Sequence, residues 1–189
     1  MRHAFILLAL CFLVLAYSAP KFENAWDSKF KFCQAAFRAV GAGSDMSAHR
    51  DCCNEEESNL LLGIFYDFFN EVASRSSKET GEAVKRFLIN ARPRISSLKM
   101  WACERDHKEM NEKFNAIVHL KMLSDDYADT LIRFANDEPE EAWIFYYNMA
   151  RYMNKRDFEK AGTIFGLMNY VMGNWNRRHH HYSESSTDL

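Results

Sequence analysis

The chain has 189 residues, of which 24 are basic and 26 are acidic, and its formal net charge is −2 at pH 7. This balance, without a basic stripe, argues against nucleic-acid binding and against adsorption to anionic membranes. The length suits one domain with a sizeable core.

The N-terminus has the layout of a secretory signal peptide. Arg2 and His3 precede an apolar run over residues 4–15, and small residues follow with A-x-S spacing at Ala16 and Ser18. We therefore expect a signal peptide at residues 1–18 and a secreted, extracellular protein. A buried N-terminal helix or an uncleaved anchor is the alternative. No later apolar run reaches the ~20 residues of a membrane span.

Removal of residues 1–18 takes away one of five cysteines and one basic residue, so the net charge becomes −3. The four remaining cysteines are Cys33, Cys52, Cys53 and Cys103. In an oxidising compartment they predict two disulfides. Because neighbouring Cα atoms are too close for a relaxed disulfide, Cys52 and Cys53 are each expected to pair with Cys33 or Cys103, in an order that stays open. Each bridge would stabilise the fold by roughly 3–4 kcal/mol.

Two other roles for these cysteines are less favoured. A redox dithiol would need a C-x-x-C arrangement, which is absent from the sequence. A zinc site is conceivable, since His49 and Cys52 have ligand spacing, but secretion favours oxidation of the thiols. We expect no metal and no cofactor.

The predicted elements are helical throughout. The first, within residues 24–43, places one stripe toward the core: Trp26, Phe30, Cys33 and Phe37. The second spans about residues 51–74 and is apolar nearly all round, which predicts a central position. The third begins at a capping box of Ser76 and Glu79, and we expect Pro93 to break or restart it. Its buried face is predicted to hold Val84, Phe87, Leu88 and Ala91.

One long helix or two are expected over residues 95–123, with Cys103 on them and Phe114 and Ile117 on one side with Met110. A further helix follows Ser124. Pro139, among acidic residues, marks the start of the next helix.

The last helix carries a stripe at steps of three and four, composed of Phe158, Ala161, Phe165, Met168, Met172 and Trp175. The short break before it predicts an antiparallel hairpin with residues 139–153. Gly162 and Gly166 would let another helix approach closely, or would merely weaken their own helix. The fold prediction is all-α: a disulfide-stapled bundle of about six to seven helices in one domain, residues 19–178, with a C-terminal antiparallel helical hairpin.

Residues 179–189 are predicted to be a disordered, polar, histidine-containing tail. Arg177 and Arg178 form a dibasic pair at which this tail could be removed. His179, His180 and His181 could also bind a metal ion weakly.

No known catalytic motif occurs in the sequence, and we expect a protein that is not an enzyme. Aromatic residues make up 14% of the chain. Residues 143–153 are apolar on more than one side and offer more apolar surface than one core contact requires. The candidate partner or ligand surface is Trp143, Tyr146, Tyr147, Arg151 and Tyr152. The expected function is the binding of an extracellular protein partner by a monomer or weak oligomer. The alternative is a carrier that holds a lipid-like or other apolar small molecule between its helices.

Overall fold

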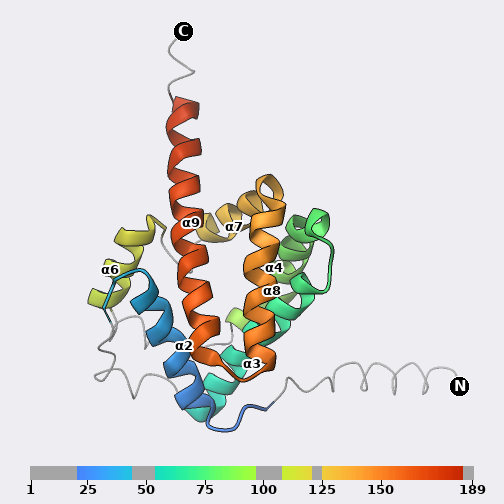
Figure 1. Ribbon diagram of the computed structural model, residues 1–189, viewed down its shortest axis with the longest axis vertical. Coiled ribbons are helices and arrows are strands. Elements are labelled where there is room, and N and C mark those ends of the chain that lie inside the picture. The colour runs from blue at the N-terminus through green and yellow to red at the C-terminus, as the bar shows by residue number, and fades with distance from the viewer. Residues whose placement is uncertain (1–20, 44–53, 97–107, 121–124, 185–189) are drawn as a thin grey trace, which may run out of the picture.

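The computed structural model describes residues 21–43, 54–96, 108–120 and 125–184, and in these ranges the fold is all-α (Figure 1). They contain seven α-helices and one short 3-10 helix, η2, but no strand. The elements are α2 (Ala25–Ala39), α3 (Glu55–Ala73), η2 (Ser77–Glu79), α4 (Thr80–Ser96), α6 (Lys108–Val118), α7 (Asp125–Asp137), α8 (Pro139–Asn154) and α9 (Phe158–Glu184). The all-α prediction is confirmed for these residues.

Several sequence predictions lie outside the described residues. They concern the signal peptide at residues 1–18 and the cysteines Cys52, Cys53 and Cys103. Cys33 lies on α2 and is half-buried. The two disulfides therefore stay a prediction.

The longest helix, α9, organises the fold (Figure 1). Its most extensive contact is with α2, and it also packs on α8, α6 and α7. Residues 155–157 connect α8 to α9, and the two helices run antiparallel side by side. On its other side α8 packs on α3, while α4 packs on α7 and α3.

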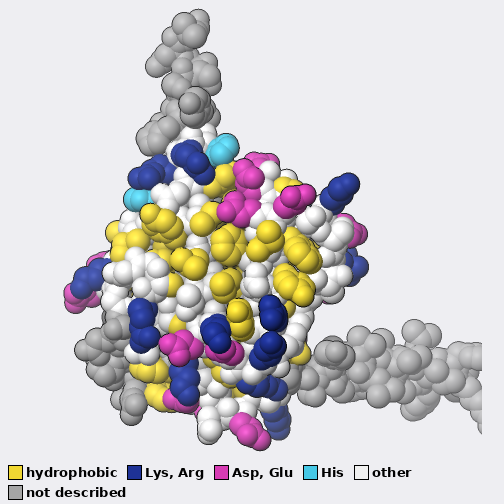
Figure 2. Space-filling view, viewed as in Figure 1, with side chains coloured by type: hydrophobic (Ala, Val, Ile, Leu, Met, Phe, Trp, Pro, Cys, Tyr) yellow, Lys and Arg dark blue, Asp and Glu magenta, His cyan; other side chains and the backbone are white. Residues whose placement is uncertain are grey.

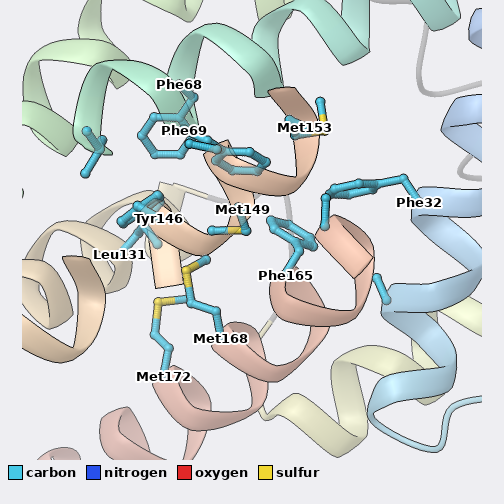
Figure 3. Packing of buried hydrophobic residues seen from close by; sticks show 14 of the residues in the cluster. Phe32, Phe68, Phe69, Leu131, Tyr146, Met149, Met153, Phe165, Met168 and Met172 are labelled. Carbon is cyan, nitrogen blue, oxygen red and sulfur yellow. The ribbon is translucent and has the colours of Figure 1, made fainter. Parts of the chain in front are cut away.

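The predicted stripe of α9 is the centre of the core (Figure 3). All six of its residues are buried, from Phe165 at 8% exposed to Met172 at 0%. The Phe165 ring lies between helices, 5.5 Å from the ring of Phe32 on α2 and 6.4 Å from that of Phe69 on α3, measured between centroids. Burial of each such side chain contributes about 1.5–3 kcal/mol. The burial of all six residues confirms the buried stripe that helical spacing predicted.

The contact between α2 and α9 is close enough to involve the main chain. A Cβ atom on Gly162 would collide with the carbonyl group of Phe32, and one on Gly166 would collide with that of Ala36. The close-approach reading of these two glycines is therefore confirmed.

The same packing shows that the predicted buried stripe of α2 is wrong. The residues buried on α2 are Ala25, Ser28, Lys29, Phe32, Ala35 and Ala36. The predicted stripe, from Trp26 to Phe37, is only half-buried. The physical reason is that Phe32 and Ala36 are the residues of α2 that meet Gly162 and Gly166 of α9. This leaves Trp26 and Phe30 at the edge of the contact, while Cys33 and Phe37 pack partly buried against the core. At that edge Trp26 and Phe30 stack on each other at 5.6 Å.

Helix α3 begins at a capping box. The Asn54 side chain accepts a hydrogen bond from the Glu57 main-chain N–H at 2.8 Å, and the Glu57 carboxylate accepts from the Asn54 N–H. The expected start near residue 51 falls outside the described residues.

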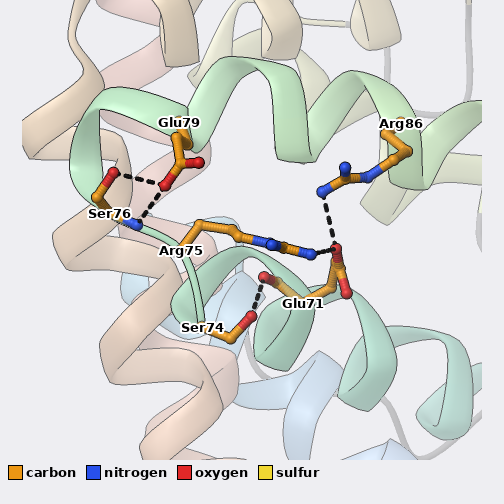
Figure 4. A network of polar contacts seen from close by, with 6 residues as sticks. All are labelled: Glu71, Ser74, Arg75, Ser76, Glu79 and Arg86. Atoms are coloured by element: carbon orange, nitrogen blue, oxygen red, sulfur yellow. Dashed lines mark hydrogen bonds and ion pairs between the residues drawn. The ribbon is translucent and has the colours of Figure 1, made fainter.

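The predicted capping box of Ser76 and Glu79 is confirmed (Figure 4). Beside it, the Glu71 carboxylate of α3 binds Arg75 in the connection that follows α3, at 3.1 Å, and Arg86 of α4, at 3.0 Å. This carboxylate joins two consecutive helices across their connection.

Two predicted helix ends are wrong. Pro93 lies inside α4, which continues to Ser96. Pro93 is exposed and so is Ile89, four residues earlier, so water can reach the carbonyl that loses its main-chain donor. In addition, α9 continues to Glu184, so residues 179–184 are helical rather than disordered. The His179 ring packs at 4.7 Å on the Trp175 ring, and His179 Nδ1 lies 2.9 Å from the Trp175 carbonyl oxygen.

Candidate functional site

The predicted surface residues of α8 do not share one face. Tyr146 is only 1% exposed, and its ring packs 5.1 Å from Phe68 in the core (Figure 3). Its hydroxyl has no hydrogen-bond partner among the described residues, and burial raises its pKa well above the ordinary value. Tyr146 lies one turn from the buried Met149 and Ala150, which places it on the inner side. Its assignment to a partner surface is wrong.

Trp143 and Tyr147 form a stacked pair at the boundary between α8 and α3. Their ring centroids are 5.0 Å apart, and the indole Nε1–H of Trp143 donates to the Arg75 carbonyl oxygen at 2.8 Å. Trp143 is half-buried, whereas Tyr147 is 46% exposed. Trp143 thus fixes the orientation of an exposed aromatic ring.

Arg151 lies beside a surface hollow between α8 and α3. The hollow has a volume of about 430 Å³ and is open to solvent. Its lining consists of Asn70, Ala73, Ser74, Tyr147, Ala150, Arg151, Asn154 and Lys155. Across it, Asn154 Nδ2 donates to Asn70 Oδ1 at 2.9 Å. Apolar surface forms the larger part of this lining, with amide, hydroxyl and cationic groups around it. The hollow is open to solvent, whereas a container for an apolar ligand would enclose most of the ligand surface. Tyr152 is half-buried on the other side of α8, where the Lys160 ammonium lies 5.6 Å from its ring.

The outward side of the α8–α9 pair carries most of the exposed large hydrophobic side chains in the described residues. Four of five are on these two helices: Ile144 at 54% exposed, Tyr147 at 46%, Tyr170 at 45% and Leu167 at 39%. We call these four residues the α8–α9 face. Figure 2 shows hydrophobic side chains gathered over the two helices. Half-buried apolar residues, among them Phe145, Ile164 and Val171, continue this surface into the core.

The sequence reasoning missed Ile144, Leu167 and Tyr170. A signal for Leu167 and Tyr170 was present, because each lies two residues from a buried Phe or Met of the core stripe and so on the opposite side of α9. Ile144 lies two residues from Tyr146, which was itself assigned to the surface, so the sequence carried no such signal for it. Exposed apolar residues on that side of a helix do not contribute to packing of the core.

Charge is unevenly distributed along α8. Its start is acidic, with Asp137, Glu138, Glu140 and Glu141 exposed. Its end and the following turn are basic, with Arg151, Lys155 and Arg156 exposed. In Figure 2 acidic side chains lie above the hydrophobic area over α8, and basic side chains lie below it. The α8–α9 face is therefore an apolar area between two poles of opposite charge.

Within the described ranges, no three His, Cys, Asp or Glu side chains come together in a group that could hold a metal ion. None of the helices in those ranges is both long and apolar enough to cross a bilayer.

Comparison with protein-family models, with curated proteins and with solved structures finds no match for this chain.

Proposed function

We propose that this protein is secreted and acts without catalysis, by binding an extracellular protein partner through the α8–α9 face. The observation that carries the proposal is the concentration of exposed apolar side chains there, from Ile144 on α8 to Leu167 and Tyr170 on α9. Scattered exposed hydrophobic residues are ordinary in a folded protein, whereas grouped ones with a charged rim are typical of protein interfaces.

The way the face is held also supports this function. Both helices pack directly on the core, through Met149 and Met153 on α8 and through Phe165 and Met168 on α9. The Trp143 indole, bonded to the Arg75 carbonyl, supports Tyr147 from behind. A face already ordered in the free protein loses little conformational entropy on binding.

The carrier function is the second candidate that the sequence left open. The described core gives it no specific support, since its aromatic rings pack on one another and the hollow beside α8 is open to solvent rather than enclosed. The mass of the secreted protein separates the two functions. A native mass that exceeds the denatured mass by a few hundred daltons of apolar material would favour the carrier.

The binding experiment compares three forms of the secreted protein: wild type, Leu167→Arg and Ile89→Arg. Ile89 on α4 is 64% exposed, more than Leu167. It serves as a matched control for non-specific binding through an exposed hydrophobic side chain. Each form is incubated with the extracellular fluid and surfaces of its own producing cells, and bound proteins are quantified by mass spectrometry. We expect one protein that binds wild type and Ile89→Arg equally and is lost with Leu167→Arg. Equal binding by all three forms would contradict the proposal.

A further inference from the structure

We infer that the α8–α9 face pairs with a second copy of this chain, with the two α8 helices antiparallel across a two-fold axis near Asn148. This inference rests on the proposed function, because it names the partner of the same face. It is carried by the order of charges along α8.

The outward side of α8 carries a regular stripe. Glu141, Ile144, Asn148, Arg151 and Lys155 follow one another at steps of three, four, three and four, so they lie on one side of the helix. All are exposed except Asn148, which is half-buried. The stripe is negative at one end, apolar and amide-bearing in the middle, and positive at the other end.

A two-fold axis in the plane of the face and perpendicular to α8 reverses the direction of the second helix. When the axis passes at Asn148, seven residues separate it from Glu141 and seven from Lys155. Glu141 of each copy then lies opposite Lys155 of the other, and Ile144 lies opposite the aliphatic stem of Arg151. A parallel arrangement would oppose like charges. The stripe is therefore self-complementary in the antiparallel direction alone.

The ionic groups of this stripe are available for such a contact. Neither Glu141 nor Lys155 has an ion-pair partner among the described residues. Glu71 and Asp157, by contrast, are bound by basic residues nearby, at 3.0 and 2.9 Å. The Arg151 guanidinium lies over the ring of Tyr152, with Cζ 6.0 Å from the ring centroid.

The second helix supplies apolar surface at the level of the axis. Residue 156, in the turn, is eight residues from both Asn148 and Ile164, so in an antiparallel hairpin these two lie at about the same height. Ile164 is half-buried, and Leu167, one turn further on, is 39% exposed. The four residues of the α8–α9 face thus lie between the level of the axis and the Glu141 end, so the two-fold axis places them opposite the aliphatic stems at the basic end of the other copy.

The test is sedimentation of the purified secreted protein over a wide concentration range. It compares wild type with Glu141→Lys, Lys155→Glu and the double variant E141K/K155E. Because the axis repeats each contact, each single variant loses two ion pairs and opposes like charges. We expect each single reversal to weaken the dimer by about tenfold or more and the double variant to restore the wild-type dissociation constant. Glu82→Lys, an exposed reversal on α4, should leave it unchanged.

Two results would overturn the inference. One is a wild-type protein that remains monomeric at the highest concentration reached. The other is a dimer in which the two single reversals have no effect or the double variant shows no rescue. Circular dichroism of each variant checks that a weaker dimer is not caused by loss of the helical fold. If the chain is monomeric but another protein still binds wild type and not Leu167→Arg, the self-association fails while the proposed function stands.

Discussion

The main-chain carbonyl of Phe32 occupies the space into which a side chain on Gly162 would project. One turn further along both helices, the carbonyl of Ala36 stands in the same relation to Gly166. Two helices in such contact are held by their backbones as well as by their side chains. The pairing of α2 with α9 therefore requires glycine at positions 162 and 166, because any other residue would place a Cβ atom where the carbonyl of α2 lies.

Gly166→Ala should destabilise the protein by about 1–3 kcal/mol, because the added methyl group must push α2 away from α9. This loss outweighs the gain of at most about 1 kcal/mol that alanine brings to a helix interior. Thermal or urea unfolding measures the difference. Leu167→Ala, at the neighbouring exposed position, is the control and should change stability by much less. An alanine variant at position 166 that is as stable as wild type would contradict the close packing.

Tyr146→Phe should raise the free energy of unfolding or leave it unchanged. The hydroxyl of Tyr146 is buried without a partner among the described residues, and such a group costs about 1–3 kcal/mol. Tyr127 is the matched control, because its buried hydroxyl donates to Asn169 Oδ1 at 2.8 Å. Tyr127→Phe should destabilise by about 1 kcal/mol. Unfolding curves that rank the two variants in the opposite order would show that this account of the hydroxyls is wrong.

The stabilising effect of Asp157 should depend on pH. Its carboxylate accepts a hydrogen bond from the Lys160 main-chain N–H at 3.2 Å at the start of α9, and its other oxygen lies 2.9 Å from Lys160 Nζ. The Lys160 side chain is the main reason that the pKa of Asp157 is below its ordinary value of 3.8. A lowered pKa in the folded state contributes stability above about pH 4, which is lost as the pH falls through the folded-state pKa.

Asp157→Ala should accordingly cost about 1 kcal/mol at pH 7, the usual value of a lost helix cap. As the pH falls through the folded-state pKa of Asp157, which lies below 3.8, the difference from wild type should shrink, since the wild-type carboxylate then loses its charge. Thermal unfolding of both proteins between pH 2.5 and 7 measures this trend. A difference that is independent of pH would mean that the charge of Asp157 plays no part.

Glu71→Gln should weaken the connection between α3 and α4, but only slightly. The variant loses the ion pairs with Arg75 and Arg86, all of whose side chains are at least 36% exposed. Exposed pairs contribute about 0.2–1 kcal/mol each and are screened by salt. The destabilisation should therefore be small at low ionic strength and smaller still in concentrated salt. A large effect that persists in salt would indicate a buried role for this carboxylate.

The sequence predicted best where one physical effect acts alone. The stripe from Phe158 to Trp175 has the period of a helix and is apolar throughout, with large side chains at all positions except Ala161, so a buried face was the expected outcome. The capping box of Ser76 and Glu79 is likewise local, because both partners lie within one turn.

The predictions failed where the outcome depends on a neighbour that is distant in sequence. The side of α2 that is buried was decided by glycines more than 120 residues further along the chain, which meet Phe32 and Ala36 rather than Trp26. Tyr146 and Tyr147 are adjacent and chemically alike, yet one packs on Phe68 and the other faces solvent. Which of these two tyrosines is buried could be decided only from the position of α3 relative to α8. The exposed apolar residues of the α8–α9 face could be predicted only as the complement of a correct core.

The far end of α9 extends beyond the other helices (Figure 1), and Arg177 and Arg178 lie on it in helical conformation. Arg177 is held there by two contacts, Nη2 donating to Asn174 Oδ1 at 3.0 Å and Nη1 at 3.3 Å from His119 Nε2. Processing enzymes act most readily on chain that is locally unfolded, so exposure alone does not make this dibasic pair a substrate. The rate of cleavage there would depend on how often the last turns of α9 unfold.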